Sequence, residues 1–508
     1  MVFRRAPSAT RWVVSVMILL LLGTSGLSAT VLGQPVVLAA GTPGTPGPAS
    51  PAAGTPAATP RAATPQSATP LAATPVTAAS PATAGIACTG PCLVRFAAGP
   101  PIDAALAATG LRASYRTDIA VWVGGTPDDL GKLIAASAEP AFIMDAAPSL
   151  MLYAVTQPEG DVGPAGLDGF GTVLDSDGAT SIVQVPTVPA PVGDLTAAGV
   201  RVEKVAPYVP AGTPLLTPES VGSLPDVSGV TDTFPDLSAD EIERTLRDLA
   251  SNGVAPGQPG TRYFSLPGNA IAAEYLYLRF AAYGLTVSYE DYVASNGMLS
   301  LNVVAEIPGR DPSQIYAGFA HYDSISDDVP DNDTAPGTLD NGTGLAVLLE
   351  NARILAGYRL NNPIRFVALD GEEVGLQGST AFGARHAELG TPLVGGINID
   401  SVGTTYGNRV LYVNASDSSA YIQDIMLEQY DANGFELNIQ PRQNPAIVAD
   451  ETPLTDAGIP TILVASMLYG DPLINCTCDT IDGVDIDYAR ATGRLVLMTF
   501  AVLAAPAA

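Results

Sequence analysis

The sequence predicts an α/β protein: a doubly wound, mostly parallel sheet flanked by helices, preceded by a small α/β accessory domain. Two observations support this fold class. From about residue 238 onward, short apolar runs alternate with segments of helical periodicity, which is typical of a largely parallel sheet covered on both faces. Further upstream, two shorter stretches each predict a strand, a helix and a second strand.

Residues 1–40 have the pattern of an export signal. Arg4, Arg5 and Arg11 precede an apolar run over 12–22, and small residues follow it. This run is short for a membrane span, but apolar character resumes through 31–40, so an N-terminal anchor stays an alternative. We therefore expect a secreted or cell-envelope-associated protein.

Residues 41–84 repeat Ala-Thr-Pro and Gly-Thr-Pro units with almost no charged or aromatic side chains. Such a segment has too little apolar surface to offset the entropy lost on ordering. It is predicted to be a disordered linker that carries no chemistry.

Residues 85–230 are predicted to form the accessory domain or a pro-domain. Its two stretches have the same order of elements, which leaves open a duplication of one unit. They cover 93–96, 102–111 and 120–123 in the first stretch, and 181–185, 192–198 and 200–205 in the second. The domain contains no histidine, and the roles of pro-segment, substrate-access cap, assembly domain and spacer all stay open.

Residues 231–508 predict the larger domain. A helix is expected over 239–249 with Ser238 as its N-cap, and another over 271–283 ending at Gly284. Strands are then expected over 314–320, 364–369 and 394–399, and they are followed directly by His321, by Glu372 and Glu373, and by Asp400. Asp340 stands just before a predicted helix over 345–355. Because ligands bind at the carboxyl ends of strands in such sheets, these side chains should meet at one edge.

The net charge of −28, from 51 acidic and 23 basic side chains, opposes binding to nucleic acid or to anionic membrane surfaces. No membrane contact is expected beyond the alternative N-terminal anchor. Four cysteines stand as Cys88, Cys92, Cys476 and Cys478, and export favours disulfides, although their pairing is not deducible.

Several carboxylates at one edge stay ionised together only if a cation neutralises them. With one imidazole among oxygen ligands, zinc is the leading candidate, ahead of manganese and cobalt. Asp327, Asp328, Asp331 and Asp333 form a second acidic run, for which a calcium site is the alternative to a solvated loop.

Four ordered motifs resemble those of the secreted di-zinc aminopeptidase family, which includes bacterial leucyl aminopeptidases and aminopeptidase Y. More distant members are glutamate carboxypeptidases and glutaminyl cyclases. The motifs are His321-Tyr-Asp-Ser324, Asp340-Asn-Gly-Thr-Gly344, the segment from Gly371 to Ser379 and Asn398-Ile-Asp400. Asp450-Glu-Thr-Pro-Leu454 and Asp479-Thr480 also match, and the resemblance covers about 238–505.

The resemblance implies a role for each residue. Asp340 bridges two zinc ions, His321 and Asp400 complete the first site, and Glu373 binds the second. Glu372 is the general base that takes a proton from the metal-bound water. Asp323 holds the His321 imidazole in its metal-binding tautomer. A cis peptide between Asp340 and Asn341 is implied as well.

One position departs from the family. The second zinc normally receives a histidine four residues before the late Asp-Thr pair, and Asn475 stands there. An amide oxygen is a poorer zinc ligand than imidazole, so the second site is expected to be weakened. The alternative replacement is a Cys476 thiolate. His386, the second of the two histidines, is expected on the surface of a helix.

Together these features predict a zinc-dependent exopeptidase, foremost an aminopeptidase acting on peptides or proteins with free N-termini. One alternative is an amidase or carboxypeptidase of the same fold. The other is a degenerate, non-catalytic peptide-binding homologue.

Overall fold

The structure is a computed structural model that describes residues 92–505 apart from 138–141, 146–151, 159–166, 168–169, 186–191, 230–233, 251–259, 445–447 and 467–469. The predicted export signal or anchor (1–40), the predicted linker (41–84) and Cys88 therefore lie outside the described residues. Within the described part of the chain, no helix is both long enough and apolar enough to span a membrane.

Residues 92–204 contain two four-stranded antiparallel sheets built to the same plan. The first unit contains β1 (Cys92–Ala97), α1 (Pro100–Thr109), β2 (Tyr115–Arg116), β3 (Ala120–Gly125), α2 (Pro127–Ser137) and β4 (Phe142–Asp145). The second contains β5 (Leu152–Thr156), β6 (Thr172–Ser176), β7 (Thr180–Gln184), α3 (Gly193–Ala197) and β8 (Arg201–Lys204). The strand orders are β2-β3-β1-β4 and β6-β7-β5-β8, so the nth strand occupies the same place in both sheets. The six elements predicted from the repeated stretches are all present. The predicted equivalence of the two stretches was wrong, because 93–96 is the first strand of its unit (β1) and 181–185 is the third (β7). The shared strand order instead relates β1 to β5 and β3 to β7.

The two sheets share an apolar core. Leu93 and Trp122 of the first sheet cluster with Leu152, Ala154 and Ile182 of the second, so one face of each sheet packs against the other. Trp122 also donates a hydrogen bond from its indole Nε1 to Asp175, which satisfies its buried polar atom.

Short helices α4 (Pro218–Val221) and η3 (Val227–Gly229) lead to α5 (Ala239–Ala250), where the Ser238 hydroxyl accepts a hydrogen bond from the Glu241 amide as predicted for an N-cap. The next helix, α6 (Pro267–Ala282), begins four residues earlier than predicted, because Pro267 is well suited to the first helical turn.

An eight-stranded sheet forms the centre of the C-terminal part. Its strands are β9 (Thr286–Val293), β10 (Leu299–Ile307), β11 (Ile315–His321), β12 (Ile364–Leu369), β13 (Leu393–Asp400), β14 (Val410–Ala415), β15 (Asn438–Gln443) and β16 (Thr461–Ala465). The order is β15-β14-β16-β13-β11-β12-β10-β9. The central strands β16, β13, β11 and β12 are parallel, whereas β10 and β9 on one side and the β14–β16 pairing on the other are antiparallel. The α/β prediction is confirmed, and the sheet is a mixed one.

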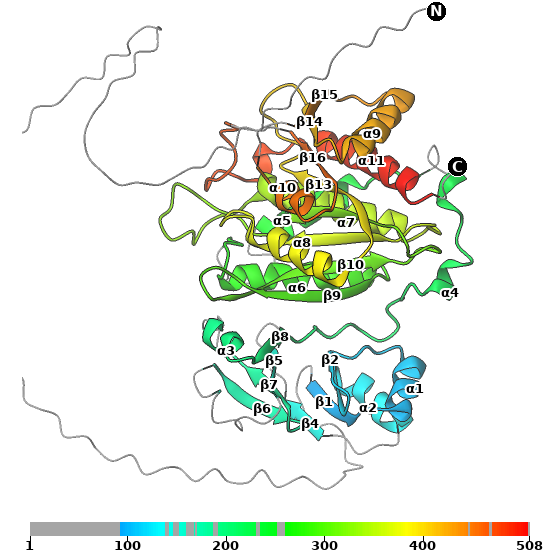
Figure 1. Ribbon diagram of the computed structural model, residues 1–508, viewed down its shortest axis with the longest axis vertical. Helices are drawn as coiled ribbons and strands as arrows, with labels where there is room; N and C mark the ends of the chain where they lie inside the picture. The colour runs from blue at the N-terminus through cyan, green and yellow to red at the C-terminus, as the bar shows by residue number, and fades with distance from the viewer. Residues whose placement is uncertain are drawn as a thin grey trace, which may run out of the picture. The chain divides into compact units, whose positions relative to one another are not determined.

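Helices cover both faces of this sheet (Figure 1). They are α7 (Thr343–Leu355), α8 (Gln377–Leu389), α9 (Ala420–Asn433), α10 (Glu451–Asp456) and α11 (Ile486–Leu503), together with α5 and α6 and the single turns η5 (Thr338–Gly342) and η6 (Ile481–Gly483). Phe382 of α8 and Leu454 of α10 pack on Phe319 and Val367 on one face. Side chains of α6, α7, α9 and α11 form the larger core on the other face.

The parallel strands explain where chemistry can occur. His321 ends β11, Asp400 ends β13, and the chain leaving β12 at Leu369 runs directly into Asp370–Glu373. These are neighbouring strands with the same direction, so their carboxyl ends meet at one edge of the sheet.

The turn into α7 leaves no space for a side chain at Gly344. A Cβ there would overlap the Asn341 amide oxygen and the Ile399 carbonyl oxygen. Gly344→Ala should therefore lower the free energy of unfolding by about 1–3 kcal/mol, measured by calorimetry. Gly131→Ala is the matched control, because Gly131 lies on exposed α2 with no atom within 4 Å of the added Cβ. It should be neutral or stabilising by about 0.5–1 kcal/mol. Equal effects of the two substitutions would contradict this packing of the α7 turn.

Candidate metal centre

His321 lies at the middle of an acidic group. Its Nε2 atom is 3.1 Å from Asp340 Oδ1 and 3.4 Å from Asp400 Oδ1, and its side chain is 1% exposed. Burial alone lowers the pKa of His321, but hydrogen bonds to Asp323, Asp340 and Asp400 outweigh it and raise this pKa well above its ordinary value. The structure therefore brings together three residues that the sequence placed on separate segments.

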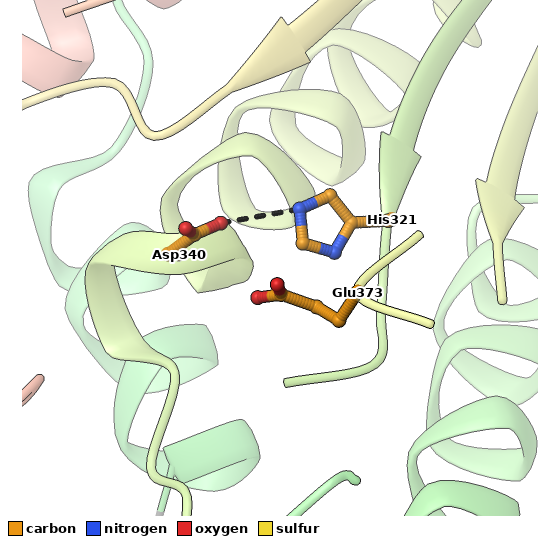
Figure 2. A group of neighbouring side chains, drawn as sticks. All are labelled: His321, Asp340 and Glu373. Atoms are coloured by element: carbon orange, nitrogen blue, oxygen red, sulfur yellow. Dashed lines mark hydrogen bonds and ion pairs between the residues drawn. The ribbon is translucent and has the colours of Figure 1, made fainter. Parts of the chain in front are cut away.

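Glu373 completes the group. One ligand atom each of His321, Asp340 and Glu373 lie within 4.8 Å of one another. Figure 2 shows the Glu373 carboxylate directed toward the space beside the imidazole and Asp340. Its Oε1 atom is buried and has no hydrogen-bond partner. A buried carboxylate oxygen without a donor indicates a missing cation or proton.

Glu372 lies beside Glu373 in the same acidic environment. Burial raises the pKa of Glu372 well above its ordinary value, and the charges of Asp450, Asp400 and Asp340 add to this rise while His321 opposes it. A carboxylate held in this way takes up a proton more readily than one in water.

Asp323 positions both parts of the site. Its two carboxylate oxygens accept hydrogen bonds of 3.1 Å from the backbone amides of Glu372 and Glu373. Oδ1 also lies 3.4 Å from His321 Nδ1. The proximity to Nδ1 agrees with the predicted role, and the hold on the Glu372–Glu373 backbone was not predicted.

The loop that carries Asp340 is held by Asp479. The Asp479 carboxylate accepts hydrogen bonds from the amides of Leu339 at 2.6 Å and Asp340 at 3.0 Å. The peptide bond between Asp340 and Asn341 is cis, as the family resemblance implied. The Asn341 side chain donates to the Ile399 carbonyl and accepts from the Ser401 amide, which ties the loop to the end of β13.

Arg262 supplies a buried positive charge to this region. Its side chain is 1% exposed, and its guanidinium donates to the carbonyl oxygens of Tyr322, Leu249, Pro336 and Gly337. Burial lowers the pKa of Arg262 to about 10, with Asp479, Asp323, Asp340 and Glu373 opposing that change, so the group stays protonated at neutral pH. These acceptors are backbone atoms from three segments of the chain, so Arg262 holds the backbone of this region in position.

Asp450 and Glu451 are acidic residues to which the sequence analysis assigned no individual role. Asp450 is fully buried, and neither of its carboxylate oxygens has a hydrogen-bond partner. Burial raises its pKa to about 7, His321 and the nearby Ser379 hydroxyl lower it, and Asp400 and Asp323 raise it. The Ser379 hydroxyl itself donates to the Leu376 carbonyl. The signal was present, because the segment 450–454 already belonged to the matching motifs.

Asn475 adopts a left-handed backbone conformation, with φ of 55°, and its carbonyl accepts a hydrogen bond from the Asp327 amide. Its amide oxygen Oδ1 is buried and has no partner. The neighbouring Cys476 forms a disulfide with Cys478, so a Cys476 thiolate is not available as a metal ligand. Cys92 is disulfide-bonded as well.

The prediction that His386 is a surface residue was wrong. Its ring is 4% exposed, lies against Phe382 and makes contacts of 3.1 and 3.2 Å from Nε2 to Glu290. The helical periodicity of α8 did not reveal that β9 lies beside this face. His386 is therefore part of a buried polar pair.

The acidic run before Asp340 contains Asp327, Asp328, Asp331 and Asp333, for which a calcium site was the alternative to a solvated loop. Asp328 accepts hydrogen bonds from the amide and hydroxyl of Thr477. Among the described residues, none of Asp327, Asp328, Asp331 and Asp333 belongs to a group of three close potential ligands.

The residues at the sheet edge fit a zinc ion. Ligand atoms at about 2.0–2.1 Å from a tetrahedral zinc lie roughly 3.3 Å from one another. The separations of 3.1 and 3.4 Å from His321 Nε2 to Asp340 and Asp400 agree with this value. The unpartnered Glu373 oxygen, together with one imidazole and several carboxylates, is also the donor set of a divalent cation.

Comparisons with known proteins point to the same region. Residues 302–500 match the model of peptidase family M28. A probable zinc metalloprotease of Pyrenophora tritici-repentis is 33% identical over 189 residues, which cover 34% of this chain and 39% of the relative. Leupeptin-inactivating enzyme 1 of Streptomyces exfoliatus is 26% identical over 262 residues, 50% of this chain and 53% of the relative. Aminopeptidase YwaD of Bacillus subtilis is 34% identical over 167 residues, 32% of this chain and 33% of the relative. The matched regions thus span between a third and about half of these relatives.

Stability without metal should fall as the pH rises. Burial raises the pKa values of Asp450, Glu451 and Asp479 to about 7, whereas those of the unfolded chain are near 4. The folded state then binds more protons than the unfolded state between about pH 4 and 7, so stability decreases through this window. Chelator-treated protein should melt at a lower temperature at pH 8 than at pH 6.

Two comparisons test whether the buried carboxylates cause this pH dependence of the melting temperature. Added zinc should reduce the difference, because it neutralises the carboxylates at the higher pH. Asp450→Asn should reduce the difference in the metal-free protein, because it removes one of the shifted groups. A melting temperature that stays constant or rises from pH 6 to pH 8 would contradict the proposed electrostatics.

Proposed function

We propose that the chain is a zinc-dependent exopeptidase, foremost an aminopeptidase, and the match of residues 302–500 to the model of peptidase family M28 supports this. The observation that carries the proposal is the convergence of His321, Asp340, Asp400 and Glu373 at the carboxyl edge of the sheet. Peptides or proteins with free N-termini are the proposed substrates.

His321, Asp340 and Asp400 are proposed to hold the first zinc ion, and Asp340 and Glu373 to hold the second. Zinc, when bound, polarises the peptide carbonyl and makes a water molecule more acidic. The Asp323 carboxylate keeps the Glu372–Glu373 backbone in place and lies beside His321 Nδ1, which favours the tautomer with a free Nε2.

Glu372 is proposed as the general base. It receives the proton of the attacking water and passes it to the nitrogen of the leaving amine. Its raised pKa supports the first step, because burial among other carboxylates makes the Glu372 carboxylate take up a proton more readily.

The charge of the site supports cleavage at a chain end. Buried carboxylates predominate around His321, and the cation nearest to them, Arg262, is directed at backbone carbonyls. A cationic α-amine is attracted to such a site.

We also propose roles for the segments outside the metal centre. Residues 1–40 are proposed to direct the protein to the cell envelope or outside it, and residues 41–84 to link it to the following units. Residues 85–230 form the proposed accessory domain or pro-domain and 231–508 the proposed catalytic domain.

Glu372→Gln should lose about 10²–10⁴-fold of kcat on leucyl 4-nitroanilide, because an amide does not accept the proton of water. Its zinc content should equal that of the wild type. Glu388→Gln on the exposed face of α8 makes the same chemical change outside the site and should keep full activity. Full activity of Glu372→Gln would remove Glu372 from the mechanism.

Asn475→His tests the weakened second site. Asn475 Oδ1 and Glu373 Oε1 are both buried without a hydrogen-bond partner, and an imidazole at position 475 would be a better zinc ligand than the amide oxygen. Wild-type protein should bind nearer one zinc than two, and Asn475→His should raise both zinc content and kcat/KM at matched free zinc. Elemental analysis gives the stoichiometry.

Two tightly bound zinc ions in the wild type would contradict the weakened site. One bound zinc with no turnover of any aminoacyl anilide or peptide would instead favour the non-catalytic peptide-binding homologue. Turnover only of substrates with blocked N-termini would favour the amidase or carboxypeptidase alternative.

A further inference from the structure

Arg262 lies where the segments that carry the proposed metal ligands meet. Its guanidinium makes four hydrogen bonds within the described part of the chain, and all four acceptors are backbone carbonyl oxygens. Nε donates to Tyr322 at 2.8 Å, Nη2 to Gly337 at 2.8 Å, and Nη1 to Pro336 at 2.6 Å and Leu249 at 3.2 Å. Because the guanidinium is planar and rigid, it holds these oxygens in one fixed arrangement.

Two of the acceptors stand next to metal ligands in the chain. Tyr322 directly follows His321 at the end of β11, and Gly337 stands three residues before Asp340. Figure 2 shows the His321 and Asp340 side chains directed toward one another from separate segments, and Nε2 and Oδ1 are 3.1 Å apart. That separation depends on how the two backbones are held, and one guanidinium contacts both of them.

The backbone of Arg262 reaches a third ligand segment. Its carbonyl accepts a hydrogen bond of 3.1 Å from the Asn269 amide, and the same amide nitrogen donates to Asp370 at 2.7 Å. Asp370 begins the turn that carries Glu372–Glu373. The Arg262 amide in turn donates to the Ser324 hydroxyl, beyond β11. Arg262 therefore contacts the His321 and Asp340 segments directly and the Glu373 segment through one side chain.

The contact is specific for a guanidinium against bare backbone. Gly337 has a φ of 54°, and a Cβ added there would overlap the Ser324 side chain and lie 2.8 Å from Arg262 Nη2. Glycine at this position thus lets the guanidinium approach the loop. A lysine at position 262 would offer three donors from a single nitrogen, which does not hold the Tyr322 and Gly337 carbonyls in the same geometry.

From these contacts we propose that Arg262 is a positioning residue for the metal centre: it holds the His321 and Asp340 segments at their observed separation and thereby sets the affinity of the first site for zinc. The inference rests on the proposed zinc-dependent function. Arg262 bonds to backbone and acts through the ligands. Groups that orient metal ligands in this way typically change metal affinity by about 10–100-fold.

The first test keeps the charge and removes the fork. Arg262→Lys should bind zinc about 10–100-fold more weakly than the wild type, measured by competition with a fluorescent zinc chelator. Arg365→Lys is the matched control, because Arg365 lies at the amino end of β12, away from the site, and donates to Glu306. It should keep the wild-type affinity.

A purely structural role of Arg262 gives a different result. Arg262→Lys would then melt at a lower temperature without zinc, while the folded protein kept the wild-type zinc affinity. That outcome, or an equal loss of zinc affinity in Arg365→Lys, would overturn the proposal.

Chemical rescue tests the same geometry in a second variant. Arg262→Ala removes the guanidinium from the four carbonyl oxygens. Millimolar guanidinium chloride should raise the zinc affinity of this variant, because the free ion offers the same planar set of donors, whereas ammonium chloride at equal ionic strength should not. Equal zinc affinity in the two salts would contradict the proposal. If Arg262→Ala does not fold, the comparison of Arg262→Lys with Arg365→Lys decides.

Zinc binding is measured without turnover, so this inference and the proposed function fail separately. Weaker zinc binding by Arg262→Lys supports the role of Arg262 even if the wild type hydrolyses no aminoacyl anilide, in which case the proposed peptidase function fails alone. Hydrolysis of leucyl 4-nitroanilide by the wild type, together with an unchanged zinc affinity in Arg262→Lys, would reject the role of Arg262 and keep the peptidase.

Discussion

The structure of the C-terminal part depends on how it accommodates many buried carboxylates at one sheet edge. Asp323, Asp340, Asp450 and Asp479 are all less than a tenth exposed, and they lie around one imidazole and one guanidinium. Each desolvated carboxylate is costly unless a donor or cation faces it. Backbone amides satisfy Asp323 and Asp479, whereas Asp450 and one oxygen of Glu373 have no protein partner.

The difference between carboxylates with and without hydrogen-bond donors links the folding of the loops to cation binding. The carboxylates that have donors hold the loops, and those without donors are free to bind a cation or a proton. Arg262 supports the arrangement from behind, because its guanidinium holds the backbone at Tyr322, Pro336 and Gly337 while its charge faces the acidic group. Without a metal ion such a site is stable only when some of its carboxylates are protonated, so a bound cation would stabilise the fold.

The sequence by itself determined the three strands that end at the site (β11, β12 and β13), the N-cap at Ser238 and the edge at which His321, Asp340, Glu373 and Asp400 meet. These follow from local periodicity and from the rule that the carboxyl ends of parallel strands lie together. Tertiary structure alone decided which carbonyl oxygens Arg262 contacts, the burial of Asp450, Glu451 and His386, and the hydrogen bonds of Asp323 and Asp479 to backbone amides. Those properties depend on contacts between segments far apart in the chain. Hydrophobic periodicity does not indicate which backbone atoms a distant side chain will contact.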